Sequence, residues 1–222
     1  MRRLVVLTNW GCEDFIKDLY DRILDKVTYD PDDVTKDDTL LLEGGTDIGP
    51  SFYGESIGKF TQTPDVLRDK VEWKQLLKFK EKGATILGIC RGAQLVTAFL
   101  GGKIIQHVTG HSRSHGHPIV TKEKINLWTS SLHHQMMHPY NLHTQEYKII
   151  ATTPHNISKY FLNGMNQEVD NRFIKVFGEP EIVWYPKIKA LAIQGHPEFM
   201  PYESKFVQYC RNLVKEKLLN VK

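Results

Sequence analysis

A cysteine with a glycine two residues away on each side is the feature that most constrains how this chain can fold. Gly88, Cys90 and Gly92 follow the apolar run 84–87 and precede a helix-forming run, 94–100. A tight turn between a buried strand and a helix forces its central residue into a strained backbone conformation. The flanking positions must then lack side chains to avoid steric clashes. The pattern predicts a nucleophile elbow, whose helix amides and dipole favour a thiolate. The alternative, a small buried core cysteine, leaves both glycines unexplained.

The rest of the chain predicts a single α/β domain over 1–222, with a mostly parallel sheet flanked by helices. Alternating strands and helices in the first hundred residues favour parallel strands with crossover helices. Between 101 and 184 the pattern loosens into short strands and turns, which predicts a hairpin-rich insertion after the nucleophile helix. Strands are expected at 4–8, 39–43, 84–89, 148–152, 181–185 and 190–194, and helices at 14–27, 64–82 (capped by Thr63 and Gly83) and 201–219.

Charge and cysteine usage exclude several classes of protein. The 29 basic and 26 acidic residues give a net charge of +3 and are interleaved, so no basic stripe supports a nucleic-acid partner. The apolar run near the N-terminus is too short for a signal peptide or a membrane span. Cys12, Cys90 and Cys210 suggest no disulfide framework, and a chain that needs a free thiol is expected in the reducing cytoplasm.

A nucleophilic cysteine needs a base and oxyanion donors at the same sheet edge. His196 follows the predicted strand 190–194, and Glu198 comes two residues later across a stiffening proline. The backbone amide of Arg91 directly follows the nucleophile, and Gly44-Gly45 follows the predicted strand 39–43. Taken alone, His-Pro-Glu and Gly-Gly are more often ordinary turns. Their positions directly after predicted strands are what favour a catalytic role.

These motifs, in this order, resemble the class I glutamine amidotransferase superfamily. The similarity is greatest to its γ-glutamyl hydrolase branch, typified by γ-glutamyl-γ-aminobutyrate hydrolase, and it covers 39–198. The matching motifs are Gly44-Gly45-Thr46-Asp47-Ile48-Gly49-Pro50 with Tyr53-Gly54-Glu55, Arg68-Asp69 with Glu72, Gly88-Ile89-Cys90-Arg91-Gly92-Ala93-Gln94, Leu100-Gly101-Gly102 with Gln106, Ser131-Leu132-His133-His134-Gln135, and Gly195-His196-Pro197-Glu198.

The resemblance implies a flavodoxin-like three-layer sandwich and a role for each matching residue. Cys90 would form a γ-glutamyl thioester, with His196 as general base and acid and Glu198 as its orienting carboxylate. The backbone amides of Gly45 and Arg91 would bind the oxyanion. The substrate would be held by Gly44, by Gln94 and by the segment that closes over its head group, with Ser131, Leu132 and His133. Without the resemblance, Gln94 would be taken for a solvent-facing helix residue.

The chain also departs from the family pattern. The stretch between Asn9 and Gly44 is too short for the usual helix, strand and second helix, which predicts a trimmed sheet edge. Ser130 stands where the family commonly has asparagine, and 156–178 matches nothing in the family pattern.

The histidines form two groups that invite a metal-site interpretation. His107, His111, His115 and His117 form one, and His133, His134 and His138 the other. Neither has a companion cysteine, so loop contacts are the favoured interpretation, and neither a metal nor a cofactor is expected.

Three functional hypotheses remain open from the sequence. The leading one is a free-standing thiol hydrolase that cleaves a γ-glutamyl amide and releases glutamate and an amine. The second is a glutaminase subunit that passes ammonia to a synthase on another polypeptide. The third is a regulatory or binding protein on the same scaffold. The expected partner is a small γ-glutamyl molecule; a homodimer stays open, and the leaving amine is not specified.

Overall fold

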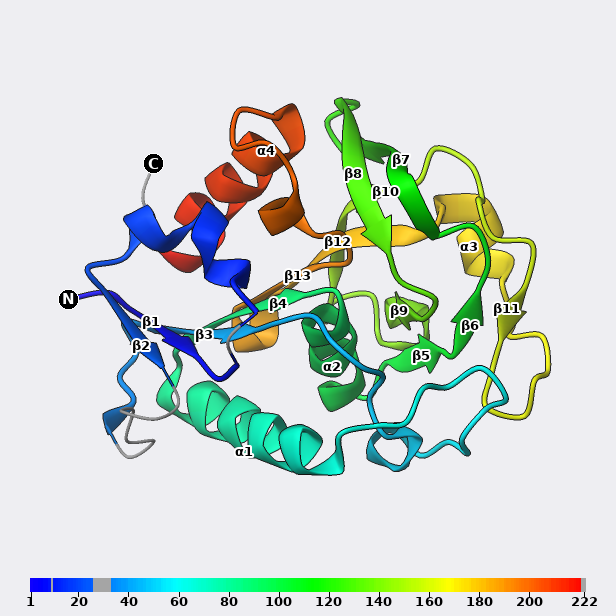
Figure 1. The fold of residues 1–222 in the computed structure, drawn as a ribbon, viewed down its shortest axis with the longest axis horizontal. Helices are drawn as coiled ribbons and strands as arrows, with labels where there is room; N and C mark the ends of the chain where they lie inside the picture. The colour runs from blue at the N-terminus through cyan, green and yellow to red at the C-terminus, as the bar shows by residue number, and fades with distance from the viewer. Residues whose placement is uncertain (9, 26–32, 221–222) are drawn as a thin grey trace.

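The computed structural model describes residues 1–8, 10–25 and 33–220, and a nine-stranded sheet runs through them (Figure 1). The strand order is β2-β1-β3-β4-β13-β12-β10-β7-β8. In chain order the strands are β1 (Arg3–Val6), β2 (Arg22–Asp25), β3 (Asp38–Leu42), β4 (Thr85–Ile89), β7 (Ser112–Thr121), β8 (Asn126–Leu132), β10 (Lys148–Thr152), β12 (Pro180–Tyr185) and β13 (Ala190–Ile193).

The sheet has a parallel half and an antiparallel half. Strands β2, β1, β3, β4 and β13 pair in parallel, with Leu40 opposite Ile86 and Ile86 opposite Ala190. Strands β12, β10, β7 and β8 continue the sheet in antiparallel pairs. The carboxyl ends of β3, β4 and β13 therefore lie side by side at one edge, where an α/β sheet binds its ligands.

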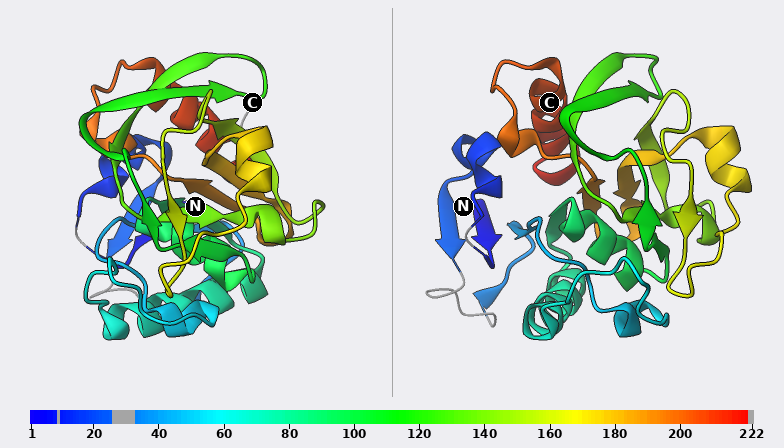
Figure 2. Two further views of the ribbon diagram at one scale, coloured as in Figure 1. Left: turned by 90° about the vertical axis from the view of Figure 1, so that its right-hand side faces the viewer. Right: turned by 45° about the vertical axis from the view of Figure 1, so that its right-hand side comes forward.

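Helices cover both faces of the parallel half. Alternate residues of β1 point to opposite faces: Leu4 and Val6 join the core under α4 (Lys205–Leu213), whereas Val5 joins the core under α1 (Val66–Lys82) and α2 (Arg91–Phe99). Figures 1 and 2 show α4 on one side of the sheet and α1 with α2 on the other. The predicted three-layer arrangement is confirmed.

Shorter elements complete the chain. Strand β5 (Lys103–Ile105) pairs with β9 (Met136–His138), and β6 (His107–Val108) pairs with β11 (Phe161–Leu162). Around them lie α3 (Arg172–Phe177), a π-helical turn Val214–Leu218 after α4, and 3-10 turns at Cys12–Phe15, Lys17–Leu19, Pro50–Tyr53, Pro139–Asn141, Pro186–Ile188 and Pro197–Phe199. None of the helices in the described ranges is long and apolar enough to cross a membrane.

All six predicted strands are present, but the predicted helix 14–27 is wrong. Two 3-10 turns and the edge strand β2 occupy its described part, whereas Lys26 and Val27 lie outside the described residues. The spacing of Phe15, Leu19 and Ile23 fits a helix, but the edge of β1 needs a hydrogen-bonding partner, and β2 supplies it.

Two helix boundaries also differ from the prediction. Asp65, not Thr63, caps α1 by accepting a hydrogen bond from the Arg68 amide at 3.0 Å. The helix ends at Gly83 in the left-handed conformation, as predicted. The last helix begins at Lys205 behind a Ser204 cap, not at Pro201.

Candidate active site

Cys90 lies at the junction of β4 and α2 in a strained backbone conformation. Its φ is 50° and its ψ is −105°, and its amide donates to the carbonyl of Ile193 at 2.8 Å. The flanking glycines have a steric reason: a Cβ at Gly88 would lie 2.6 Å from the Gly92 carbonyl carbon, and one at Gly92 would lie 2.1 Å from the Leu42 carbonyl oxygen. The local geometry is that of a nucleophile elbow.

The structure brings His196 and Glu198 to Cys90. Ile89 pairs with Ile193, so the turn after β13 begins beside the elbow. His196 Nδ1 lies 2.7 Å from Glu198 Oε1, and the imidazole is also hydrogen-bonded to Cys90. Burial lowers the pKa of His196, but the hydrogen bonds to Cys90 and Glu198 outweigh burial and raise it to about 10.

Ser130 fixes the backbone of His196 from the end of β8. The His196 amide donates to Ser130 Oγ at 2.7 Å, and the Ser130 hydroxyl donates to the His196 carbonyl at 2.9 Å. The residue that departs from the family pattern therefore contacts the histidine backbone. Sequence reasoning named Ser130 only as a departure.

The Gly44-Gly45 turn packs directly on this group. A Cβ at Gly44 would lie 2.9 Å from His196 Cε1, and one at Gly45, where φ is 139°, would lie 2.3 Å from Arg68 Nη1. Side chains are therefore excluded at both positions. The turn therefore lies beside Cys90 and His196.

Cys12 is a member of the site that sequence reasoning missed. Its thiol lies 3.1 Å from Glu198 Oε1 and is also hydrogen-bonded to the Gly44 backbone. Burial, reinforced by the nearby Glu198 charge, raises the pKa of Cys12 far above that of an ordinary thiol. Cys12 therefore stays protonated and donates to Glu198, which couples the glycine turn to the carboxylate. No motif around Cys12 signals this contact.

A buried ionic network connects the residue after Cys90 to helix α1. The Arg91 guanidinium pairs with Asp69 and Glu72 of α1, and Arg68 Nε donates to Glu72 at 2.8 Å. Asp69 also accepts from the Gly49 amide at 2.9 Å, and Arg68 donates to the Glu43 carbonyl at 3.1 Å. The network thus joins α1, α2 and the segment after β3.

Gln94 is buried, which excludes the alternative that it is a solvent-facing helix residue. Its Nε2 donates to the Gln135 carbonyl at 3.0 Å. Two further glutamines, not predicted as site residues, lie in this region. Gln194 Nε2 approaches Cys90 Sγ at 3.8 Å from the end of β13. The Gln135 side-chain amide is buried, with no hydrogen-bond partner among the described residues. The position of Gln194 after a strand could have indicated it.

The predicted substrate segment divides between interior and surface. Ser131 is buried and donates to the His111 carbonyl at 2.5 Å, and the His133 ring is buried with Nδ1 on the Gln135 carbonyl at 2.8 Å. Leu132, between them, is 51% exposed. Only the two outer residues of this segment therefore reach the interior of the molecule.

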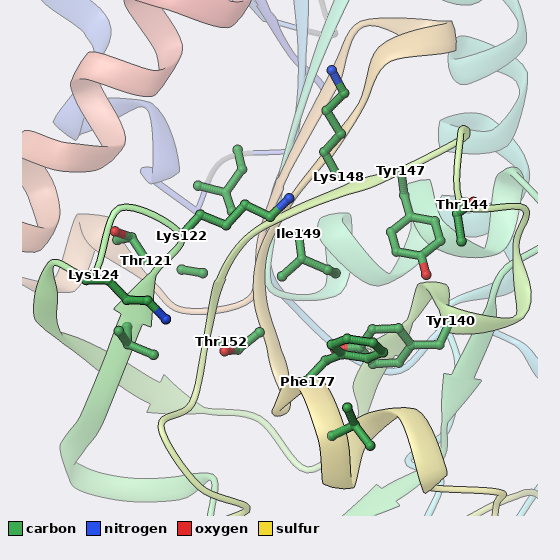
Figure 3. A pocket seen from close by; sticks show the side chains of 14 residues that line it. Thr121, Lys122, Lys124, Tyr140, Thr144, Tyr147, Lys148, Ile149, Thr152 and Phe177 are labelled. Carbon is green, nitrogen blue, oxygen red and sulfur yellow. The ribbon is translucent and has the colours of Figure 1, made fainter.

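One hollow lies away from these residues, and a second borders them. A groove of about 720 Å³ between β7, β10 and α3 is lined by Lys122, Tyr147 and Phe177 among others, and its lining contains none of the predicted site residues (Figure 3). A second hollow of about 520 Å³ includes Thr46 and Arg68, which flank the glycine turn.

The elbow, the neighbouring His-Glu pair and the three-layer sheet together define a class I glutamine amidotransferase-like protein. Solved structures show the same fold: a glutamine amidotransferase from Thermotoga maritima aligns over 97% of this chain and 85% of its own, with a TM-score of 0.52 and 13% identity. PurLQS from Thermotoga maritima aligns over 99% of this chain and 98% of its own, with a TM-score of 0.54 and 15% identity.

Sequence comparison identifies the family. The Peptidase C26 profile matches residues 28–159, and the chain belongs to the Peptidase C26 family. The glutamine amidotransferase-like protein YvdE of Lactococcus lactis is 26% identical over 173 residues, which are 72% of this chain and 66% of YvdE. The protein PB2B2.05 of Schizosaccharomyces pombe, also named for the glutamine amidotransferases, is 37% identical over 73 residues, 32% of this chain and 29% of its own. The matches thus span less than two thirds of these relatives.

Proposed function

We propose that this protein hydrolyses a γ-glutamyl amide through a γ-glutamyl thioester on Cys90. The observation that carries the proposal is the hydrogen-bonded series Cys90, His196 and Glu198, with Cys90 held at φ 50° on an elbow. Membership in the Peptidase C26 family supports the reaction class.

In the first half of the proposed reaction, the Cys90 thiolate attacks the γ-carbonyl carbon of the substrate. The carbonyl oxygen takes up negative charge and accepts hydrogen bonds from the backbone amides of Gly45 and Arg91. Protonated His196 then gives its proton to the leaving nitrogen as the C–N bond breaks. The amine departs, the thioester remains, and His196 is neutral.

In the second half, neutral His196 takes a proton from a water molecule, whose oxygen attacks the thioester carbon. The C–S bond breaks, glutamate leaves, and Cys90 again carries the thiolate beside a protonated His196. Glu198 and Cys12 do not react; Glu198 orients the imidazole, and Cys12 positions Glu198.

The glutamyl head group is expected to contact the side chain of Gln135. The Gln135 side-chain amide is buried and has no hydrogen-bond partner among the described residues. A ligand that hydrogen-bonds to it would satisfy this buried polar group. Gln94 acts through Gln135 by fixing the Gln135 backbone. We assign Gln94 a positioning role.

The test is an assay of the purified chain against a panel of γ-glutamyl amines and glutamine, with intact-mass detection of an acid-quenched adduct. The wild type should release glutamate and carry one γ-glutamyl group, whereas Cys90→Ala should do neither. Cys210→Ala is the matched control, because Cys210 lies in α4 and its side chain is buried in the core. An adduct that persists in Cys90→Ala would overturn the proposal.

The names of the relatives favour a second candidate, a glutaminase subunit that delivers ammonia to a synthase. The same cysteine chemistry would serve it, with ammonia as the leaving amine. Hydrolysis of glutamine that begins only when a synthase is added would select this candidate. Turnover of a γ-glutamyl amine by the isolated chain would select the free-standing hydrolase.

A further inference from the structure

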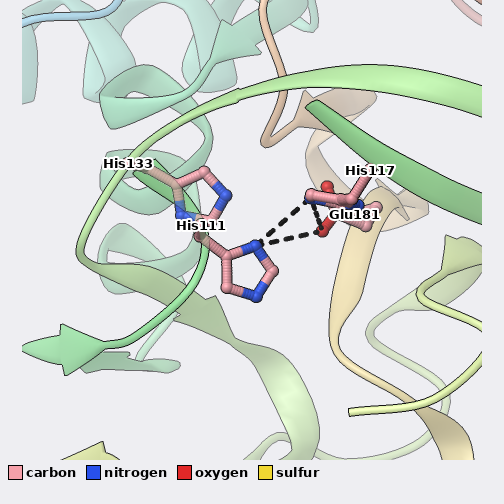
Figure 4. A group of neighbouring side chains, drawn as sticks. All are labelled: His111, His117, His133 and Glu181. Atoms are coloured by element: carbon pink, nitrogen blue, oxygen red, sulfur yellow. Dashed lines mark hydrogen bonds and ion pairs between the residues drawn. The ribbon is translucent and has the colours of Figure 1, made fainter. Parts of the chain in front are cut away.

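Four buried side chains from four separate positions converge beside the antiparallel half of the sheet. His111 precedes β7, His117 lies in β7, His133 follows β8, and Glu181 lies in β12. One nitrogen or carboxylate oxygen from each lies within 4.8 Å of the corresponding atoms of the others (Figure 4). Sequence reasoning placed the histidines in two separate groups and did not include Glu181.

The ligand atoms of His111, His117 and Glu181 form a triangle close in size to one face of a zinc tetrahedron. His111 Nδ1 lies 3.2 Å from His117 Nε2, His117 Nε2 lies 3.3 Å from Glu181 Oε1, and His111 Nδ1 lies 3.9 Å from Glu181 Oε1. Four ligands at about 2.0–2.1 Å from a tetrahedral zinc ion are roughly 3.3 Å apart. Closing all four atoms, which lie within 4.8 Å of one another, to this spacing would bring them to bonding distance from one centre.

The remaining ring nitrogens are held as metal-ligating histidines usually are. His117 Nδ1 lies 3.2 Å from the Pro118 carbonyl, and His133 Nδ1 lies 2.8 Å from the Gln135 carbonyl. A carbonyl oxygen only accepts, so each of these Nδ1 atoms carries a hydrogen, and Nε2 is the nitrogen that can bind a metal. Such outer contacts orient ligating imidazoles.

His111 is oriented the other way round, with Nε2 towards a carboxylate and Nδ1 towards the other histidines. Its Nε2 lies 3.2 Å from Glu179 Oε2, a carboxylate that also accepts hydrogen bonds from Thr153, Ile157 and Ser158. His111 Nδ1 faces His117 Nε2 at 3.2 Å. The two nitrogens share a hydrogen bond at this distance, and a metal ion bound between them would take the place of the shared proton.

We propose that His111, His117, His133 and Glu181 bind one zinc ion. Three imidazoles and a carboxylate suit zinc, and four protein ligands leave no open position, as in structural zinc sites. The ion would tie the β7–β8 hairpin to β12 of the main sheet. It would also fix His133, whose Nδ1 contacts the same Gln135 carbonyl that Gln94 binds.

The test measures metal content and affinity in the full-length chain. Protein stripped of metal is reloaded with zinc against a chromophoric chelator, dialysed and analysed by mass spectrometry. Wild type should hold one zinc per chain, whereas His111→Ala and Glu181→Gln should bind at least about 100-fold more weakly. His115→Ala is the matched control, because His115 lies in β7 but is exposed.

Two further measurements stay informative if the alanine variant fails to fold. Cobalt in the wild type should give the visible absorption of a tetrahedral ion. His117→Cys keeps four ligands, so it should retain the metal and add a thiolate-to-cobalt absorption band. Wild type that binds no stoichiometric zinc, or zinc content unchanged in both His111→Ala and Glu181→Gln, would overturn the proposal.

Discussion

The backbone at Cys90 is held where only glycine is comfortable. With φ at 50° and ψ at −105°, its Cβ meets a steric penalty that the rest of the fold must offset. Glycine would be easier to accommodate there, but it has no thiol. The strain is therefore the structural cost of presenting a side chain at the tip of the turn.

This strain predicts a difference between two inactive variants. Cys90→Gly should be more stable than Cys90→Ala by about 1 kcal/mol, because both lack the thiol but only alanine keeps a Cβ at positive φ. Urea denaturation of the two proteins measures the difference. Equal unfolding free energies would show that the turn is not strained.

His196 predicts a dependence of stability on pH. Its pKa is raised from 6.5 to about 10 by Cys90 and Glu198 in spite of burial, so folding favours its protonated form. That contribution is complete below pH 6.5, the unfolded value, and is lost as the pH rises towards 10.

Glu198→Gln should narrow this pH window, because it removes a carboxylate that raises the pKa of His196. Urea unfolding at pH 6 and pH 9.5 should therefore show a smaller loss of stability in the variant than in the wild type. Glu203→Gln, at a nearby exposed position, is the control and should behave as wild type. If all three proteins lose the same stability between pH 6 and pH 9.5, His196 is not the source of the pH dependence.

At the scale of elements, the site depends on how β8 meets the turn after β13. The two hydrogen bonds between Ser130 and the His196 backbone connect the antiparallel hairpin to the parallel half of the sheet. Gly195 allows this close approach, because a Cβ there would lie 2.1 Å from Thr129 Oγ1.

Ser130→Ala should therefore lower kcat about tenfold, because the imidazole loses its fixed orientation. The matched control is Ser204→Ala, which removes the α4 cap at an expected cost of about 1 kcal/mol. Both variants should lose stability, but only Ser130→Ala should lose kcat. If Ser204→Ala loses kcat to the same extent, the effect of Ser130→Ala is explained by lost stability and not by the orientation of His196.

The sequence predicted those parts of the fold that depend on local pattern. Continuous apolar runs located the six strands, and the glycines around Cys90 located the elbow. The segment of 3-10 turns before β2 was not predictable, because its residues fit a helix and only the unpaired edge of β1 decides against it. Cys12 and Glu181 reach their clusters through the fold, so neighbouring residues carry no sign of their contacts.

At the scale of the whole molecule, the buried ionic network links α1 and α2, the helices that precede and follow β4 in the sequence. Arg91 of α2 has two carboxylates of α1 as partners, and one of these, Glu72, is shared with Arg68. All four side chains are largely buried, so each charge depends on the others for compensation.

Glu72→Gln should accordingly reduce the unfolding free energy by roughly 3 kcal/mol, because it removes a buried carboxylate that compensates the charges of both Arg68 and Arg91. Denaturant titration measures this loss. Glu81→Gln is the control: it lies on the same helix but is exposed, and it should change the free energy by less than about 0.5 kcal/mol. Similar losses in both variants would argue against a stabilising network.

The position of β13 beside β4 also has a consequence for synthesis of the protein on the ribosome. About a hundred residues separate these neighbours in the chain, so the apolar edge of β4 emerges long before the strand that covers it. At roughly 5–20 residues per second, that edge waits on the order of 5–20 seconds. Throughout that interval the nascent chain exposes an unpaired strand, the kind of edge on which chains aggregate.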